Sequence, residues 1–77
     1  MAESAYVLME VTVTDRRKVM ENISTLSGVR RVHTVTGPYD IIAYVEAEGI
    51  RELEHLFTQM RSQSGVARMT TCFAFQD

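Results

Sequence analysis

The segment SGVRRVHTV at residues 27–35 has a near copy, SGVARMTTC, at residues 64–72. Each copy begins with Ser-Gly-Val and follows a stretch whose apolar residues have helical spacing. The repeat therefore indicates two half-domains, each ending in a helix followed by a strand. Between the copies, residues 35–42 (VTGPYDII) place a Gly-Pro turn between two β-rich runs, which is typical of a hairpin joining the halves.

The hydrophobic pattern predicts four strands and two helices. The strands are expected at residues 5–13, 29–36, 39–46 and 66–75, which are rich in β-branched and aromatic residues. The first helix is expected from an N-cap at Thr14-Asp15 to about Leu26, and the second from Ile50 to a point before Gly65. Gly28 suits the end of the first helix, because glycine adopts a left-handed conformation without steric cost.

This element order predicts a ferredoxin-like α+β sandwich (βαββαβ), with a four-stranded antiparallel sheet and both helices on one face. The two predicted strands at 5–13 and 39–46 are apolar on both faces, with Val7 and Ile41 on one side and Tyr6 and Tyr44 on the other. Two helices cover only one face, and a bare apolar face on the order of several hundred Å² is more than monomers usually expose. We therefore expect a dimeric α/β barrel with the sheets packed face to face. A monomer with an exposed apolar sheet is the alternative.

The composition limits the class of protein. The chain has 77 residues, enough for one domain spanning 1–77 with a core at about 5–75. Eight basic and ten acidic residues give a net charge of −2, a poor footprint for nucleic acid. No apolar run approaches the roughly 20 residues that span a membrane, and the N-terminus lacks signal-peptide features, so a cytoplasmic location is expected.

The sequence offers little for catalysis, metal binding or a cofactor, and none of these is predicted. His33 and His55 fall in different elements without a carboxylate at catalytic or ligand spacing, so both are expected to be solvated or core histidines. Cys72, the single cysteine, excludes an internal disulfide and is expected to be a small buried thiol in the last strand. No Gly-rich phosphate loop is present.

The hairpin sequence VTGPYDII at residues 35–42 resembles the V-x-G-x-[YF]-D-hydrophobic signature of the Lrp/AsnC ligand-binding domain, the module for regulation of amino-acid metabolism (RAM domain). Residues 26–32 (LSGVRRV) are similar to the family's L-P-G-V entry to its second strand, and residues 64–71 to its entry to the fourth. Family members usually carry a helix-turn-helix before this module. Only four residues precede the first expected strand, so the resemblance is to the stand-alone form, and direct DNA binding is not expected.

The resemblance implies a function and a site. Modules of this family dimerise through their sheets, the dimers often form rings, and an amino-acid effector binds in clefts between dimers. The family's effector contacts correspond here to Gly37, Tyr39, Asp40, Thr70 and Thr71. Gly37 offers backbone N–H groups to a carboxylate, Asp40 an acceptor for an α-ammonium, and the hydroxyls adaptable hydrogen bonds. Full-length Lrp/AsnC regulators are further expected partners.

Other interpretations stay open at this level. Gly37-Pro38 also suits a simple turn, Tyr39 a packed aromatic ring, and Asp40 a carboxylate that satisfies nearby backbone donors. Pro38 is a departure at this site, because it stiffens the turn and removes a backbone N–H donor. Two alternatives to a regulatory module stay open. One is a small dimeric α/β-barrel enzyme of the cofactor-free monooxygenase or isomerase type, and the other is a purely structural assembly module.

Overall fold

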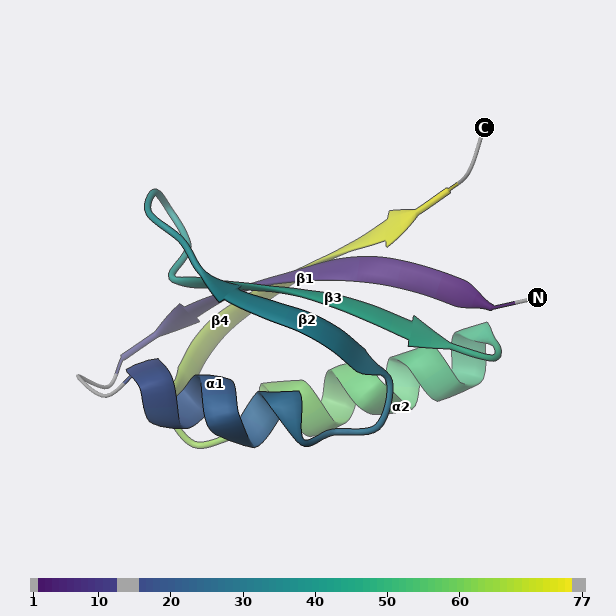
Figure 1. The fold of residues 1–77 in the computed structure, drawn as a ribbon, viewed down its shortest axis with the longest axis horizontal. Helices are drawn as coiled ribbons and strands as arrows, with labels where there is room; N and C mark the ends of the chain where they lie inside the picture. The colour runs from purple at the N-terminus through teal and green to yellow at the C-terminus, as the bar shows by residue number, and fades with distance from the viewer. Residues whose placement is uncertain (1, 13–15, 76–77) are drawn as a thin grey trace.

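The computed structural model describes residues 2–12 and 16–75, which form one antiparallel sheet and two helices. The elements are β1 (Glu3–Val11), α1 (Arg16–Ser24), β2 (Val29–Thr34), β3 (Ile41–Ala47), α2 (Ile50–Arg61) and β4 (Val66–Ala74). The strand order is β2-β3-β1-β4, and both helices lie against the same face of the sheet (Figure 1). The predicted ferredoxin-like α+β fold is confirmed. No helix in the described part of the chain is long and apolar enough to cross a membrane.

The boundaries differ from the prediction mainly at the hairpin. β2 ends at Thr34 and β3 begins at Ile41, so residues 35–40 form a longer connection than a tight turn. Gly37 has a φ of +123°, and Pro38 has no N–H to donate, so neither continues the ladder. The hairpin nevertheless closes, because the Val35 N–H donates to the Asp40 carbonyl over 2.9 Å. The predicted N-cap at residues 14–15 and the end of the first strand at residue 13 lie outside the described residues.

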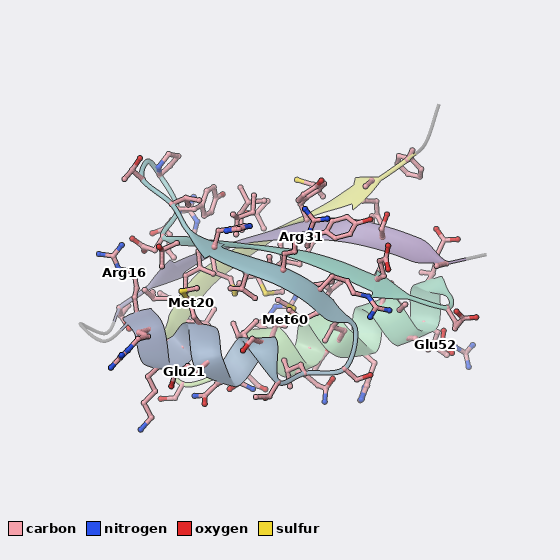
Figure 2. All side chains as sticks on the ribbon, in the orientation of Figure 1. Arg16, Met20, Glu21, Arg31, Glu52 and Met60 are labelled. Atoms are coloured by element: carbon pink, nitrogen blue, oxygen red, sulfur yellow. The ribbon has the colours of Figure 1, made fainter. Side chains whose placement is uncertain are left out.

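The core lies between the sheet and the helices, as the alternation in the strands predicts. Figure 2 shows Met20 and Met60 in this layer and Arg31 on the opposite side of the sheet. All side chains classed as buried among the described residues are apolar. They are Ala5, Val7, Met9, Val19, Ile23, Ile41, Ala43, Val45, Leu53, Leu56, Phe57 and Met60.

Each copy of the repeat contains a β-bulge directly after its Gly-Val pair. Val29 pairs with Val45 but Arg31 pairs with Tyr44, which leaves Arg30 as the extra residue of β2. In the same way, Val66 pairs with Val11 and Arg68 with Glu10, which leaves Ala67 as the extra residue of β4. An extra residue reverses which side chains face the core. Downstream of each bulge, every side chain therefore lies on the opposite face of the sheet from the one that strict alternation predicts.

The repeated glycines end both helices and bring the backbone of neighbouring segments together. Gly28 and Gly65 have φ values of +100° and +96°. The Gly28 carbonyl accepts from the Glu46 N–H over 2.8 Å, and the Gly65 carbonyl accepts from the Thr12 N–H over 2.9 Å. A Cβ at position 28 would lie 2.7 Å from the Glu46 carbonyl oxygen, so this close approach admits only glycine.

Replacing Gly28 by alanine should destabilise the fold more than the same change at Gly37. Both glycines have a positive φ, but a Cβ at position 37 would meet nothing within 4 Å, whereas one at position 28 would meet backbone and the Leu56 side chain. We expect Gly37→Ala to lower the free energy of unfolding by about 1 kcal/mol and Gly28→Ala by about 2–4 kcal/mol. Urea unfolding at one protein concentration measures both. Equal losses would contradict the role of the close approach.

Candidate functional site

The β2–β3 connection rises from the sheet on the side away from the helices (Figure 1). At this end, the Tyr39 hydroxyl and the Thr70 Oγ1 lie 2.8 Å apart, and either oxygen can donate. This hydrogen bond links the connection to β4, across residues 31 positions apart in the chain. The structure thus brings together two of the residues expected at the site.

Asp40 holds the base of the connection against β1. Its Oδ2 accepts from the Val11 N–H over 3.0 Å, and its own N–H donates to the Met9 carbonyl over 2.9 Å. Its Oδ1 lies 4.0 Å from the Arg16 guanidinium, which is a long ion pair between partly exposed groups. The carboxylate therefore has a structural partner on one oxygen, while the other faces a cation at the surface.

Gly37 and Thr71 lie in different surroundings. Gly37 is exposed in the connection, and the space that a Cβ would occupy there is open, so its backbone is accessible. Thr71 follows Thr70 in β4 and therefore points to the opposite face of the sheet. It lies across from Val7 and is half-buried on the side of the helices. The structure groups Gly37, Tyr39 and Asp40 in the connection, ties Tyr39 to Thr70, and separates Thr71 from them.

The sheet face without helices, here called the open face, has an aromatic and aliphatic centre. Tyr6 and Tyr44 are directly opposite each other in β1 and β3, with ring centroids 5.1 Å apart and planes tilted by 51°. Leu8 and Ile42 form the next pair along the same strands. Tyr6 is 44% exposed, so large apolar surface faces solvent in the isolated chain.

Cys72 lies on this open face and is exposed, so the prediction of a buried thiol is wrong. The bulge at Ala67 determines which face Cys72 occupies. Counting alternate residues back from Cys72 leads to Val66, which is half-buried and packs against the core. The extra residue moves Cys72 to the other face, opposite Tyr6.

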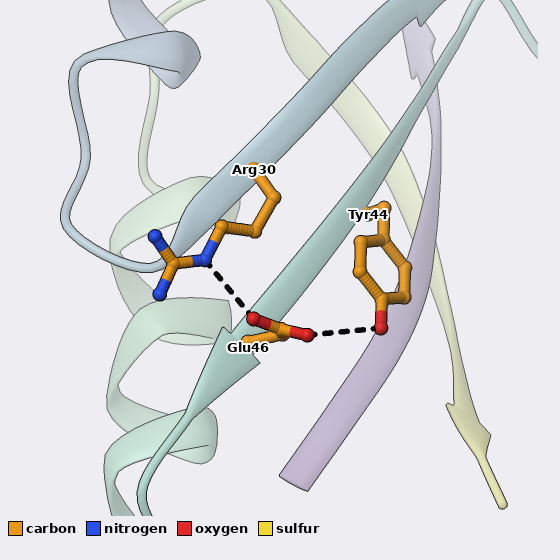
Figure 3. Close-up of polar contacts among 3 residues, drawn as sticks. All are labelled: Arg30, Tyr44 and Glu46. Carbon is orange, nitrogen blue, oxygen red and sulfur yellow. Dashed lines mark hydrogen bonds and ion pairs between the residues drawn. The ribbon is translucent and has the colours of Figure 1, made fainter. Parts of the chain in front are cut away.

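Charged groups border the open face. Glu46 accepts from the Arg30 Nε over 3.1 Å and from the Tyr44 hydroxyl over 3.1 Å (Figure 3). At the other end, Arg68 lies 3.4 Å from Glu10. His33 and His55 are exposed, and no group of three or more metal-ligating side chains occurs among the described residues.

Sequence reasoning missed the grouping of Arg31 and His33 with the aromatic centre. The two side chains line a surface hollow of about 450 Å³ together with Tyr6, Ile42, Tyr44 and Glu46. The sequence alone indicated that Arg30-Arg31 could bind an anion or form a solvated strand edge, and that His33 is a solvated or core histidine, but it placed neither beside the aromatic residues. No sequence signal revealed this grouping, because the bulge that turns Arg31 to the open face is seen only in the pairing of β2 with β3.

The fold and this arrangement define a small α+β module with an open apolar sheet face and a polar connection at one end. The Lrp/AsnC ligand binding domain model matches residues 4–77, and the chain belongs to this family. No curated protein matches the chain.

Solved structures agree with this assignment. The protein TTHA0845 from Thermus thermophilus is 36% identical over 97% of this chain and 95% of its own, with a TM-score of 0.90. The hypothetical protein PHS023 from Pyrococcus horikoshii is 27% identical over 100% of this chain and 93% of its own, with a TM-score of 0.88. The transcriptional regulator NMB0573 from Neisseria meningitidis, solved as an L-Met complex, shares the fold at 15% identity and a TM-score of 0.84. That match covers 97% of this chain and 51% of the regulator.

Removing the Asp40 carboxylate should destabilise the protein more than removing the Tyr39 hydroxyl. Asp40→Ala leaves the half-buried Val11 N–H without its acceptor, and we expect a loss of about 1–3 kcal/mol in the free energy of unfolding. Tyr39→Phe breaks an exposed bond whose partner, Thr70, turns to water, so the loss should be below about 1 kcal/mol. Urea unfolding of both variants checks this. A larger loss in Tyr39→Phe would refute the structural role given to Asp40.

Proposed function

We propose that this chain is a non-enzymatic regulatory module that binds an amino acid or a related small metabolite in clefts between dimers. Its membership of the Lrp/AsnC ligand-binding family supports a regulatory binding role. The relative crystallised with L-Met supports an amino-acid ligand. The observation that carries the proposal is the Tyr39–Thr70 contact, because it joins the signature connection to β4 beside an accessible glycine backbone.

The chemistry of this site suits a zwitterion. The exposed backbone at Gly37 can donate to an α-carboxylate, and the Tyr39–Thr70 hydroxyl pair can turn to donate or accept. The Asp40 Oδ1 beside Arg16 offers the negative group that an α-ammonium requires. Thr71 takes no part in the proposed site, because it faces the helices. A neighbouring dimer would supply the remaining walls of the cleft.

The same proposal includes a homodimer formed by the open faces of two copies. Tyr6, Leu8, Ile42 and Tyr44 form a continuous apolar centre that two helices leave uncovered. Burial of such a centre stabilises association by roughly 25 cal/mol per Å² of apolar surface. Assembly of dimers into a ring, pairing with full-length Lrp/AsnC regulators and a cytoplasmic location remain sequence-based predictions.

An enzymatic role is the less favoured alternative. A small α/β-barrel enzyme would need a polar pocket between the sheet and the helices. In the described residues, every buried side chain of that layer is apolar. A purely structural assembly module shares the fold and the dimer with a sensor, so only a ligand distinguishes the two.

A thermal-shift screen of the twenty amino acids should identify a ligand. A ligand present at ten times its Kd stabilises the native protein by about 1.4 kcal/mol, which for a chain of this size raises the Tm by about 5–10 °C. The informative variant is Thr70→Val, which keeps the β-branched shape and removes the hydroxyl that contacts Tyr39. Asp40→Ala is a poor variant here, because it also loosens the fold. A shift that persists in Thr70→Val would place the ligand elsewhere, and no shift from any amino acid would favour the structural module.

Charging the open face should prevent dimerisation. We expect Tyr6→Glu to be monomeric in sedimentation velocity at micromolar concentrations where the natural chain is a dimer, because the change buries a carboxylate in the apolar centre. His55→Glu is the matched control, since His55 is exposed on α2, on the opposite side of the sheet. Dissociation of both variants, or a monomeric natural chain, would contradict the proposed interface.

A further inference from the structure

The hollow on the open face differs from the rest of that face in its chemistry. Its floor is the Tyr6–Tyr44 ring pair and Ile42, and its rim carries Arg31 and His33 from β2 and Glu46 from β3. Arg31 lies opposite Tyr44 in the register, and His33 lies opposite Ile42. An apolar, aromatic floor and two nitrogen donors on one side therefore share a space of about 450 Å³.

The carboxylates around the hollow already have partners, whereas Arg31 has none within the part of the chain that the structure describes. Glu46 contacts Arg30 and the Tyr44 hydroxyl, and Glu10 contacts Arg68. Among residues 2–12 and 16–75, no hydrogen bond or ion pair involves the side chain of Arg31 or His33. The hollow thus carries an unmatched positive charge.

This imbalance matters when a second copy covers the open face. A guanidinium taken out of water without a counter-charge destabilises an interface strongly, because a buried cation needs both an anion and acceptors for its donors. The carboxylates on the open faces of both copies are engaged with their own arginines. A small anion that paired with Arg31 would remove this cost in the closed dimer.

We infer that the hollow binds a small organic anion, an aromatic monocarboxylate, which is enclosed between the two sheets and strengthens their association. The inference rests on the proposed face-to-face dimer, but its site is separate from the Tyr39–Thr70 site. The Arg31 guanidinium pairs with the carboxylate through two parallel N–H donors, and His33 supplies a further donor. The planar body of the ligand packs on the Tyr6 and Tyr44 rings and on Ile42.

The chain contains no tryptophan, so an indole ligand can be followed by its own fluorescence. Indole-3-acetate is the probe, indole-3-acetamide tests the need for the charge, and acetate tests the need for the aromatic body. We expect indole-3-acetate to bind with a Kd below about 1 mM, and the other two at least tenfold more weakly. In sedimentation velocity, indole-3-acetate should shift the monomer–dimer equilibrium towards the dimer.

Arg31→Gln should weaken indole-3-acetate binding at least tenfold, and His33→Gln less. Arg51→Gln is the matched control, because it removes the same charge from an exposed position on α2 and should leave binding unchanged. Two outcomes would overturn the inference and leave the proposed function intact. One is equal binding of indole-3-acetate by Arg31→Gln and the natural chain, and the other is no binding by a natural chain that is dimeric. Without the probe, Arg31→Gln should dimerise more strongly than the natural chain, because it removes the unmatched cation. A monomeric natural chain would overturn the dimer and this inference together, while the amino-acid screen still tests the Tyr39–Thr70 site.

Discussion

The bulges that follow Gly28 and Gly65 decide which side chains of the two edge strands reach the core and which reach the open face. Because each bulge adds one residue, Val29 and Val66 face the helices while Arg31 and Arg68 face the other way. The glycine before each bulge allows the strand to start against a neighbouring backbone, with a carbonyl that accepts from Glu46 or Thr12. Arg31 and Arg68 therefore reach the open face because of these two local irregularities, whereas Glu10 and Glu46 reach it by the regular alternation of β1 and β3.

The fold itself could be predicted from the sequence because it depends on repeated and local signals. The Ser-Gly-Val repeat, the helical spacing before each copy and the alternation in β1 and β3 all agree with one topology. The face of β4 could not be predicted in the same way. A bulge is a property of the pairing between two strands, and Ala67 carries no mark of it in isolation, so the sequence could not show that Cys72 is exposed on the open face.

The expected site illustrates the same limit. Residue types in the hairpin indicated hydrogen-bonding groups for a ligand, but the partner of each group lies far along the chain. The Asp40 carboxylate binds the Val11 N–H, 29 positions away, and the Tyr39 hydroxyl meets Thr70. Thr70 and Thr71 were equivalent as sequence and are separated by the pleat of β4. The pairing of β4 with β1 therefore decides which of the two threonines contacts the β2–β3 connection, and this pairing is not visible in the sequence.

The size of the chain connects stability, assembly and the two proposed sites. A domain of 77 residues buries only about two thirds of its surface, and here the buried side chains lie on one side of the sheet. In the proposed dimer, the open face contributes to stability because a second copy covers it. A ligand that binds the dimer more tightly than the monomer, such as an anion paired with Arg31, would stabilise the dimer by that difference in affinity. A ligand in a cleft between dimers acts on the next level of the same equilibrium, because that cleft exists only once the dimers have formed. In the proposed assembly, the binding of both ligands would therefore be reciprocal with association, and a change of oligomeric state would be the output of such a sensor.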